Sequence, residues 1–481
     1  MRSLLNQSTQ RTISIIEALS EANTWFTLKD LSILTDSSER TLAQDINTIK
    51  KRWGNYLNIE TSNKNGIRMH DPNIAKTGKV IIDLLNESVS LQFIEAILLY
   101  PKNKIDFYEQ KLFVSRSTIL RLLPRINQFL KERELWIQNQ ENQYELKGTN
   151  EQYLRQFFTC FLIELHSLNL KNELEKFNIG IIADTLKKIL VQNLPTKEQE
   201  YIVEDNIAVS FLIMFYIVSL IRENSGYCVD STHKIDSELS LDTFDYFKSY
   251  FPELTIKRIA PIHAFIINMY MGWDSKMEEE KTTNAIHSFY NRIFDFMQTI
   301  PKQNIFYRLC FTMKSVYLVA KSRPYQTSIL FDRIHYFSLS LKKNNETLYK
   351  LVKENLDIFS KEVGFDMSNR LADILFWICL NYPEFSKVSI SKSALVISDF
   401  GKQHTDYLTQ FFDSFFNNNG NTILTTTSSD YRSAITMPLQ QYNFIISTIP
   451  DLPIDHNHII LVNDYPNTEN LFEIHKMLFS N

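Results

Sequence analysis

The stretch LKDLSILTDSSERTLAQDINTIKKRW, residues 28–53, decides the fold of the N-terminal part of this chain. Three leucines are spaced to line one side of a short first helix: Leu28, Leu31 and Leu34. The polar residues 35–37 can form a turn, and Ser38 can then cap a second helix. Two short helices joined by such a turn are the layout of a helix-turn-helix.

The second helix of this motif has one apolar face and one polar face. Its apolar residues fall within about 60° on a helical wheel: Leu42, Ile46, Ile49 and Trp53. The opposite side presents a guanidinium, two amides and an ammonium group, from Arg40, Gln44, Asn47 and Lys51. Such groups hydrogen-bond base edges in a major groove or neutralise phosphates, so the pattern predicts contact with DNA. The alternative is an ordinary solvated face of the helix.

A β-hairpin is predicted after this helix. In LNIETSNKNGIRM, residues 57–69, apolar side chains alternate with polar ones on both sides of an Asn-Gly turn. The hairpin completes a winged helix, and it places Lys64 and Arg68 where they can bind backbone phosphates.

The same layout returns 77 residues later, in YEQKLFVSRSTILRLLPRINQFL at residues 108–130. Residues 135–148 then supply a second alternating hairpin. The outward residues of the second helix here are Ser117, Arg121, Pro124 and Gln128, with Arg116 and Arg125 beside them. Positive charge is thus kept, but the amide pattern is lost. Pro124 lacks an N–H and clashes with the preceding turn, which predicts a kink or an early end of the helix. We therefore expect this unit to position DNA more than to read it.

The middle of the chain is predicted to be helical and the end to be mixed. Apolar residues recur at helical spacing over residues 151–390, enough for two bundles that divide at the charged run 277–281. The last part, residues 391–481, has short β-branched runs at 393–398, 443–448 and 458–463 with helical stretches between or after them. Alternating strands and helices predict a small α/β domain with a mostly parallel sheet. The fold class is thus mostly α and multidomain.

Composition excludes several classes of protein. The ten glycines are never closer than twelve residues apart, so no Gly-rich loop can hold a nucleotide phosphate. The four cysteines are widely spaced and are expected to be buried free thiols of a reducing cytoplasm. The longest apolar run, residues 208–221, is expected to be a buried helix too short to span a bilayer. No cofactor, metal or catalytic constellation is expected.

Charge is unevenly distributed along the chain. Residues 1–150 hold 20 basic against 17 acidic side chains, whereas residues 391–481 hold 4 against 9. Only the N-terminal third is net basic, which fits contact with a nucleic acid at that end. An aromatic helix in the acidic C-terminal part offers an apolar patch for self-association: Tyr407, Phe411, Phe412, Phe415 and Phe416. The alternative is that these rings pack on the sheet.

The order of these parts resembles the Mga and AtxA type of transcriptional regulators of Gram-positive bacteria. The resemblance depends on the architecture and on the stretches LSILTDSSERTLAQDI and LFVSRSTILRLL. It implies winged helix-turn-helix domains at 1–85 and 86–150 and a C-terminal domain at 391–481 similar to the IIB component of sugar phosphotransferase systems. It implies phosphotransferase-regulation domains at 151–278 and 279–390.

The resemblance also implies regulation by histidine phosphorylation and by dimerisation. Candidate acceptors are His166, His233, His263, His287 and His335. We prefer His263 and His287, which stand at predicted helix beginnings, although an ordinary packed or surface histidine is the commoner case. An active IIB component carries a cysteine after its first strand, where this chain has Asp399 and His404. Phosphoryl transfer through this domain is therefore not expected.

The sequence thus predicts a cytoplasmic, non-enzymatic, DNA-binding transcriptional regulator, an activator, that forms a homodimer or higher oligomer and works with phosphotransferase-system proteins. One alternative is an RNA-binding antiterminator, since phosphotransferase-regulation domains also occur there. The small β-rich RNA-binding module of that class has no counterpart before residue 150. The other alternative is a phosphocarrier that uses residues 391–481, which the missing cysteine argues against.

Overall fold

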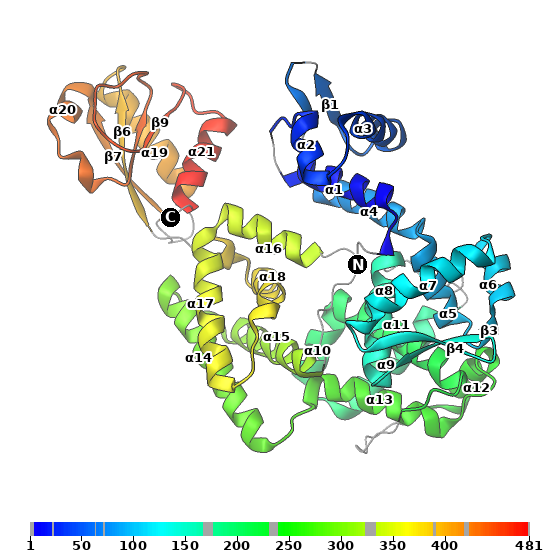
Figure 1. Cartoon of the computed structure of the whole chain (residues 1–481). Helices are drawn as coiled ribbons and strands as arrows, with labels where there is room; N and C mark the ends of the chain where they lie inside the picture. Colours follow the sequence, from blue (N-terminus) through cyan, green and yellow to red (C-terminus); the bar gives the residue numbers. More distant parts are fainter. Residues whose placement is uncertain are drawn as a thin grey trace. The chain divides into compact units, whose positions relative to one another are not determined.

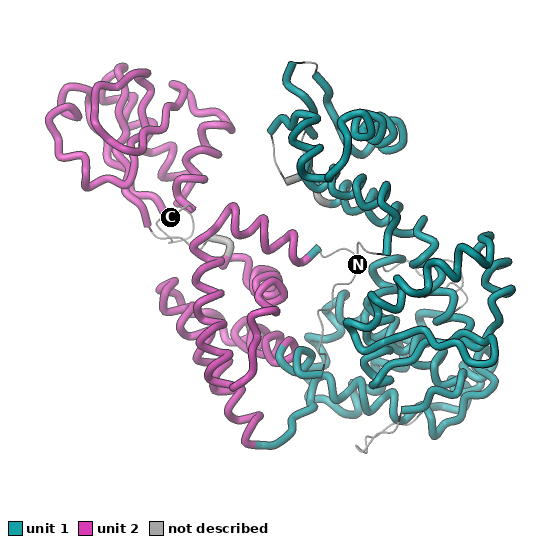
Figure 2. Tube along the Cα trace, in the orientation of Figure 1, with its two compact units in different colours: residues 1–276, 317–333 teal, residues 277–316, 334–481 magenta. Residues whose placement is uncertain are grey.

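The structure of the chain is a computed structural model (Figure 1). It describes residues 4–21, 24–62, 64–70, 73–166, 177–229, 239–322, 333–387, 391–417 and 423–479. The chain forms two compact units (Figure 2). Unit 1 comprises residues 1–276 and 317–333, and unit 2 comprises residues 277–316 and 334–481.

The first winged helix opens unit 1. Its elements are α1 (Gln7–Glu21), α2 (Leu28–Thr35), α3 (Glu39–Trp53), β1 (Ile59–Ser62) and β2 (Gly66–Met69). The predicted turn is confirmed, because Asp36 ends α2 in the left-handed conformation and the Ser38 side chain accepts a hydrogen bond from the Thr41 amide. The prediction for Leu34 was wrong, since this side chain is 56% exposed while Leu31 is fully buried. The short helix buries only one residue of its predicted stripe.

The second winged helix follows in the same unit. The helix α4 (Ile74–Asn86) precedes it, and its elements are α5 (Val89–Leu99), β3 (Asn103–Lys104), α6 (Ile105–Leu112), α7 (Arg116–Lys131), β4 (Leu135–Gln140) and β5 (Gln143–Gly148). The strands form an antiparallel sheet in the order β3-β5-β4. The helix α7 continues through Pro124 to Lys131, so the predicted early end was wrong. Burial of Ile126, Phe129 and Leu130 after the proline stabilises the last turns.

The repeat extends to the pairing of strands. Phe26 pairs with Ile67 in the first winged helix, and Asn103 pairs with Tyr144 in the second winged helix. Both members of the second pair are displaced by 77 residues from those of the first. The hairpins differ in their turns. In the first, Gly66 has a φ of +99° and a Cβ there would lie 2.1 Å from Phe26 O, so only glycine fits. In the second, residues 141–142 both have positive φ, as a two-residue hairpin turn requires.

The rest of unit 1 is helical. It contains α8 (Glu151–His166), α9 (Ile179–Asn193), α10 (Thr196–Glu204), α11 (Asn206–Asn224), α12 (Leu241–Tyr250) and α13 (Ile256–Met271). The central helix α11 packs against α8, α9, α10 and α13. Within the described ranges, α11 alone is long and apolar enough to cross a membrane by length and composition, so the expectation that this segment is too short fails. However, 61% of that window is buried, as in the core helix of a bundle.

Unit 2 begins with a second group of helices. These are α14 (Lys276–Met297), α15 (Gln303–Ser322), α16 (Arg333–Asn344), α17 (Glu346–Val363), η3 (Ser368–Arg370), α18 (Leu371–Asn381) and η4 (Pro383–Lys387). The first residue of α14, the last six of α15 and the first of α16 belong to unit 1. Aromatic rings fill the core, where Phe294 lies 5.3 Å from Phe385 and Phe289 lies 6.2 Å from Phe359 between ring centroids.

A small parallel sheet ends the chain. Its elements are β6 (Lys392–Ser398), α19 (Lys402–Phe416), β7 (Leu424–Asp430), α20 (Tyr431–Thr436), η5 (Leu439–Gln441), β8 (Phe444–Ser447), β9 (Ile459–Leu461) and α21 (Thr468–Phe479). All neighbours in the order β7-β6-β8-β9 are parallel, as predicted. The strand β7 was not predicted, because its LTTTSSD sequence has few apolar residues and the strand lies at the edge of the sheet.

The four cysteines are free, as expected, but not all are buried. Cys160 is buried, Cys310 and Cys379 are partly exposed, and Cys228 is exposed. The prediction of burial was therefore wrong for Cys228, which follows the end of α11 in a polar segment.

Candidate nucleic-acid interface

The two faces of α3 are arranged as its periodicity predicts. Leu42, Ile46, Ile49 and Trp53 are each at most 5% exposed. All four outward residues are exposed: Arg40, Gln44, Asn47 and Lys51. Across the ranges that the structure describes, none of these four side chains has a hydrogen bond or an ion pair. Their donors and acceptors are therefore available to a ligand.

Other basic residues of α3 have internal partners. Lys50 Nζ lies 3.1 Å from Thr61 Oγ1 on β1, which ties the helix to the wing. Arg52 pairs with Glu87, and its guanidinium lies 4.2 Å from the centre of the Trp53 ring. Among the described residues, the free cations of α3 are therefore those that point away from the buried stripe.

The first wing presents one of its two predicted cations freely. Lys64 is exposed at the tip of the hairpin, and its ammonium has no partner among the described residues. Arg68 Nη2 instead lies 2.8 Å from Glu60 Oε2 across the hairpin, and its guanidinium lies 4.6 Å from the Trp25 ring centre. A phosphate would have to compete with Glu60 for Arg68, so Lys64 is the better candidate for a phosphate contact.

In the second winged helix, α7 corresponds to α3 and begins at a cap equivalent to Ser38. Ser115 accepts a hydrogen bond from the Thr118 amide, and Ser117 Oγ lies 2.9 Å from Ser115 Oγ. Arg121 is exposed and has no partner within the described part of the chain. Arg116 lies 4.0 Å from Asp106 in an exposed pair, which is a weak restraint.

Arg125 does not belong to this surface. Its Nη2 donates to the backbone carbonyl of Leu5, at the N-terminal side of α1. The guanidinium therefore connects α7 with the N-terminus of unit 1, and the prediction that Arg125 contacts DNA does not fit its position. No local pattern in the sequence indicates this contact, because the two residues are 120 positions apart.

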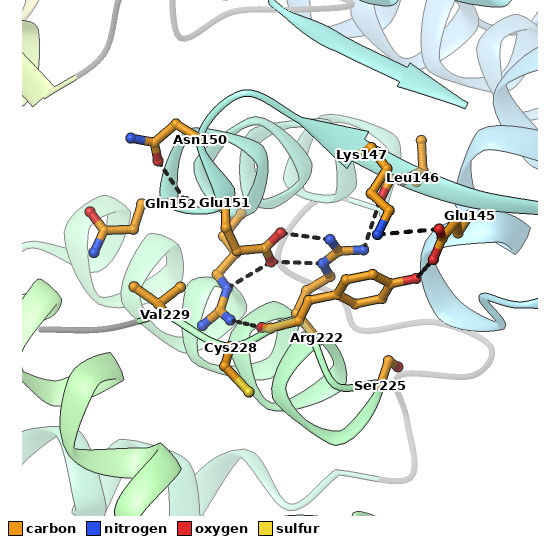
Figure 3. Close-up of polar contacts among 12 residues, drawn as sticks. Glu145, Leu146, Lys147, Asn150, Glu151, Gln152, Arg222, Ser225, Cys228 and Val229 are labelled. Atoms are coloured by element: carbon orange, nitrogen blue, oxygen red, sulfur yellow. Dashed lines mark hydrogen bonds and ion pairs between the residues drawn. The ribbon is translucent and has the colours of Figure 1, made fainter. Parts of the chain in front are cut away.

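A buried ion-pair network joins the second wing to the helices of unit 1 (Figure 3). Glu151, at the start of α8, binds Arg155 at 3.1 Å and Arg222 at 2.6 Å. Arg155 also lies 2.8 Å from Glu223. The side chains of both arginines and of Glu223 are at most 2% exposed. Burying a charge is costly unless it is paired, so each member depends on the others.

The network reaches β5 through Leu146 and Glu145 (Figure 3). Arg222 Nη1 donates to Leu146 O at 3.3 Å, and the Arg222 guanidinium lies 3.6 Å from the centre of the Tyr227 ring. The Tyr227 hydroxyl donates to the Glu145 carboxylate. Burial of Glu145 favours a higher pKa, but hydrogen bonds from Tyr227 and Lys147 outweigh it and lower the pKa. The second wing is thereby fixed to the helices.

The candidate phosphoacceptor histidines lie in different environments. His263 is fully buried, and its Nε2 lies 2.9 Å from the Tyr216 hydroxyl. Burial lowers the pKa of His263 to about 3, so the ring is neutral and closed to a phosphoryl donor. This position argues against His263 as an acceptor. His287 on α14 is partly exposed, and its ring lies 5.5 Å from that of Phe306.

The remaining histidines are weaker candidates. His166 is buried, with Nε2 2.7 Å from Glu95 Oε1. His335 is exposed on α16. His233 lies outside the described residues.

The loop after β6 is occupied by internal contacts. His404 Nδ1 lies 2.7 Å from Ser398 Oγ, and its Nε2 lies 2.9 Å from the backbone carbonyl of Asp464. Asp399 accepts a hydrogen bond from Thr448 at 3.3 Å. Both ring nitrogens of His404 therefore have partners, in a loop that holds no cysteine.

The aromatic helix α19 divides into two faces. Phe412 and Phe416 belong to the core between α19, α21 and the sheet, as the packing alternative predicts. Four nearby rings are 40–72% exposed: Tyr407 and Phe415 on α19, Phe400 before α19 and Tyr465 after β9. Phe411 contacts three of them, with ring centroids 6.1 Å from Tyr407, 6.4 Å from Phe415 and 6.0 Å from Tyr465. We name these five residues the aromatic stripe.

Two family models match the N-terminal part of the chain. The M protein trans-acting positive regulator (MGA) HTH domain matches residues 8–65, which cover the first winged helix as far as β1, and the Mga helix-turn-helix domain matches residues 75–162, which include α5 to β5. Both matched domains carry the name Mga, and they support an Mga/AtxA-type regulator. The second match extends beyond β5 into α8, the helix that holds Glu151 and Arg155 of the buried network.

Similarity to known regulators runs along the whole chain. The capsule synthesis positive regulator AcpB of Bacillus anthracis is 20% identical, with 96% of each chain covered. The anthrax toxin expression trans-acting positive regulator of the same organism is 20% identical, covering 97% of this chain and 98% of its own. A putative trans-acting regulator of Streptococcus pneumoniae serotype 4 is 19% identical, covering 100% and 99%. All three relatives are named as regulators.

Proposed function

We propose that the chain is a cytoplasmic transcriptional activator that binds duplex DNA through its two winged helices. The observation that carries the proposal is the outward face of α3, where four polar side chains are exposed and unpaired within the described residues. In this proposal Arg40, Gln44, Asn47 and Lys51 enter a major groove, because their amides and cations match the groups that base edges and phosphates present.

The neighbouring cations would bind the DNA backbone. Lys64 at the tip of the first wing takes a phosphate, and Arg116, Ser117 and Arg121 perform a similar task at the start of α7. Arg68 contributes only if the phosphate displaces Glu60, and Arg125 is left out because Leu5 already binds it. The domain boundaries near residues 85, 150, 278 and 390 are part of the same proposal.

Two rival functions are less well supported. An RNA-binding antiterminator would need a dedicated RNA module, whereas the N-terminal matches are helix-turn-helix domains. A phosphocarrier would need a nucleophile in the loop after β6, where His404 has both ring nitrogens occupied. The names of the relatives, positive regulators of capsule and toxin expression, favour an activator.

The experiment that tests DNA binding is fluorescence anisotropy of the full chain over a salt series, with labelled duplex DNA and a hairpin RNA. The proposal expects salt-sensitive binding to the duplex in preference to the RNA. Preference for the RNA would favour the antiterminator instead. Binding to neither by a folded protein would contradict the proposal.

Dimerisation through the aromatic stripe is the second part of the proposal. Five neighbouring rings on and beside α19 form an apolar surface larger than a single exposed side chain, and the partner is a second copy of this chain. Sedimentation of a Phe415→Glu variant should show fewer dimers than the parent chain. The matched control is Phe472→Glu, which places the same charge at an exposed ring on α21. An unchanged oligomeric state in both variants would remove this part.

Phosphorylation is proposed only for His287, by a protein of the sugar phosphotransferase system. This ring is partly exposed, and no hydrogen bond of it is found within the described ranges, whereas His263 is closed. Incubation with a phosphorylated phosphocarrier protein should label the parent chain and not a His287→Ala variant. Equal labelling of both would exclude this site.

A further inference from the structure

The two helix-turn-helix motifs differ in the exposed apolar side chains of the turn and of the second helix. At the 77-residue offset, Phe113 occupies the position of Asp36, and Leu120 occupies the position of Ala43. Phe113 is 94% exposed and Leu120 is 44% exposed. Phe113 lies in the turn that leads into α7, and Leu120 lies on α7 itself, directly before Arg121. The second winged helix thus carries apolar groups where the first winged helix carries a carboxylate and a methyl group.

Phe113 is also in an unfavourable backbone conformation. Its φ is +54°, in the left-handed region that Asn and Asp tolerate but bulky residues rarely adopt. Asp36, at the equivalent position, has a φ of +47° and suits the same turn. The Phe113 ring makes no aromatic contact with any described residue. Neither packing nor turn geometry therefore explains a phenylalanine here, which points to an external partner.

The position of Phe113 and Leu120, and the charge beside them, favour DNA as that partner. The major groove exposes one apolar group, the C5 methyl of thymine, and apolar side chains recognise it by contact. Leu120 is flanked by two exposed cations, Arg116 four residues before it and Arg121 directly after it. Cations on both sides would hold the apolar side chains against a phosphate-lined groove.

We propose that the second winged helix recognises thymine methyl groups through Phe113 and Leu120, while Arg116 and Arg121 bind the adjacent phosphates. This inference rests on the proposed DNA binding and adds a base preference to it. The first winged helix recognises hydrogen-bond donors and acceptors of the bases through α3. The second winged helix recognises their apolar surface through the turn before α7 and α7 itself. The target is therefore duplex DNA with thymines in the half that α7 contacts.

The test uses the full chain and two duplexes, one made only of A·T pairs and the same duplex with uracil in place of every thymine. Uracil lacks only the methyl group and keeps the Watson–Crick pairing. The parent protein should bind the uracil duplex about fourfold more weakly for each methyl group that the protein touches. A Phe113→Asn/Leu120→Ala variant should bind the thymine duplex more weakly and should not distinguish the two duplexes.

Stability separates a binding role from a structural one. Asparagine is suited to the left-handed turn, so Phe113→Asn should leave the Tm of the protein unchanged or raise it. A lower affinity in a protein of equal or higher Tm then comes from the removal of an interaction with DNA. The matched control is Leu34→Ala, which removes an exposed leucine from the first unit and should retain the parent's preference for thymine.

The possible failures can be distinguished. Salt-sensitive binding with equal affinity for the two duplexes would overturn the thymine inference and leave DNA binding intact. A double variant that weakens binding to both duplexes by the same factor would also overturn it. If the parent chain binds neither duplex, the proposed function itself fails, and the inference fails with it.

Discussion

The two winged helices share one layout and differ in how their wings are held. Position 68 in the first wing is Arg68, and the equivalent position 77 residues later is Glu145. Arg68 pairs with Glu60 inside its own hairpin, and both side chains are at least 32% exposed. Glu145 is 7% exposed and accepts a hydrogen bond from Tyr227, which follows α11. The charged side chain at this position is partly exposed in the first wing, and in the second it is buried against the helices of unit 1.

The difference suggests a division of tasks between duplicated units. The second wing is held by Arg222 and the buried network, so its strand β5 is unavailable to a nucleic acid. The first wing keeps an exposed Lys64 at its tip, unpaired among the described residues. A repeat can thus retain the same strand register while one copy serves binding and the other connects the binding region to the helices. Substitutions in the two units can test this contrast.

The largest effect is expected from the network of the second wing. Glu151→Gln removes the carboxylate that pairs with the buried Arg222, while Arg155 keeps Glu223, and should lower the free energy of unfolding by about 3 kcal/mol. The matched change in the first wing, Glu60→Gln, breaks an exposed pair and should cost less than about 1 kcal/mol. Urea denaturation followed by tryptophan fluorescence measures both. Equal losses in the two variants would mean that the wings are held alike.

The next effect concerns affinity for DNA. Arg40→Ala/Lys51→Ala should weaken duplex binding by about 1 to 3 kcal/mol and reduce the salt slope by about one unit for each phosphate no longer neutralised. The control is Lys187→Ala/Lys188→Ala, which removes two exposed charges from α9 and should have little effect. Anisotropy titrations at several salt concentrations measure affinity and slope together. An unchanged affinity and slope in the folded Arg40/Lys51 variant would exclude α3 from the groove.

The caps of the two recognition helices should contribute similarly. Ser38 and Ser115 each accept a hydrogen bond from the backbone amide three residues later, at 3.2 Å and 3.4 Å. Ser38→Ala and Ser115→Ala should each lower the free energy of unfolding by about 1 kcal/mol. Thermal denaturation of both variants compares the units directly. A much larger loss for either would show that its helix depends on the cap more than on packing.

The smallest effect is a pH dependence of the capping box of α2, which has no counterpart in α6. The backbone hydrogen bond from Thr27, and then that from its side chain, lower the pKa of Asp30 below its ordinary value of 3.8. The capping box should therefore stabilise α2 above that value and lose its effect as the pH falls through the lowered pKa. In the second winged helix, Lys104 and Phe107 occupy the positions of Thr27 and Asp30, so α6 has no such capping box.

Hydrogen exchange of backbone amides checks this prediction. Protection of the first turn of α2 should decrease on acidification, while that of α6 should change less. An Asp30→Asn variant should show little of this pH dependence in α2. Similar acid sensitivity of α2 and α6 in the parent chain would contradict the assignment.

Local sequence rules predicted the units well because their signals lie within a few residues of one another. The stripe from Leu42 to Trp53 follows from helical periodicity, and the cap at Ser38 follows from the chemistry of helix termini. The same rules missed β7, whose Thr and Ser residues carry little apolar signal at the edge of a sheet. They also missed that Pro124 would be accommodated, because packing of later residues outweighs the missing hydrogen bond.

The sequence by itself determined the order of the domains, the two helix-turn-helix units, the exposed face of α3 and the absence of a cysteine in the C-terminal α/β domain. Only the tertiary structure decided which charges remain available. Arg68, Arg125 and His263 have partners eight to 120 residues away, at Glu60, Leu5 and Tyr216. Periodicity reports which side of one helix is polar, but the availability of a charge depends on what other segments bring to it, and chain folding alone sets those distances.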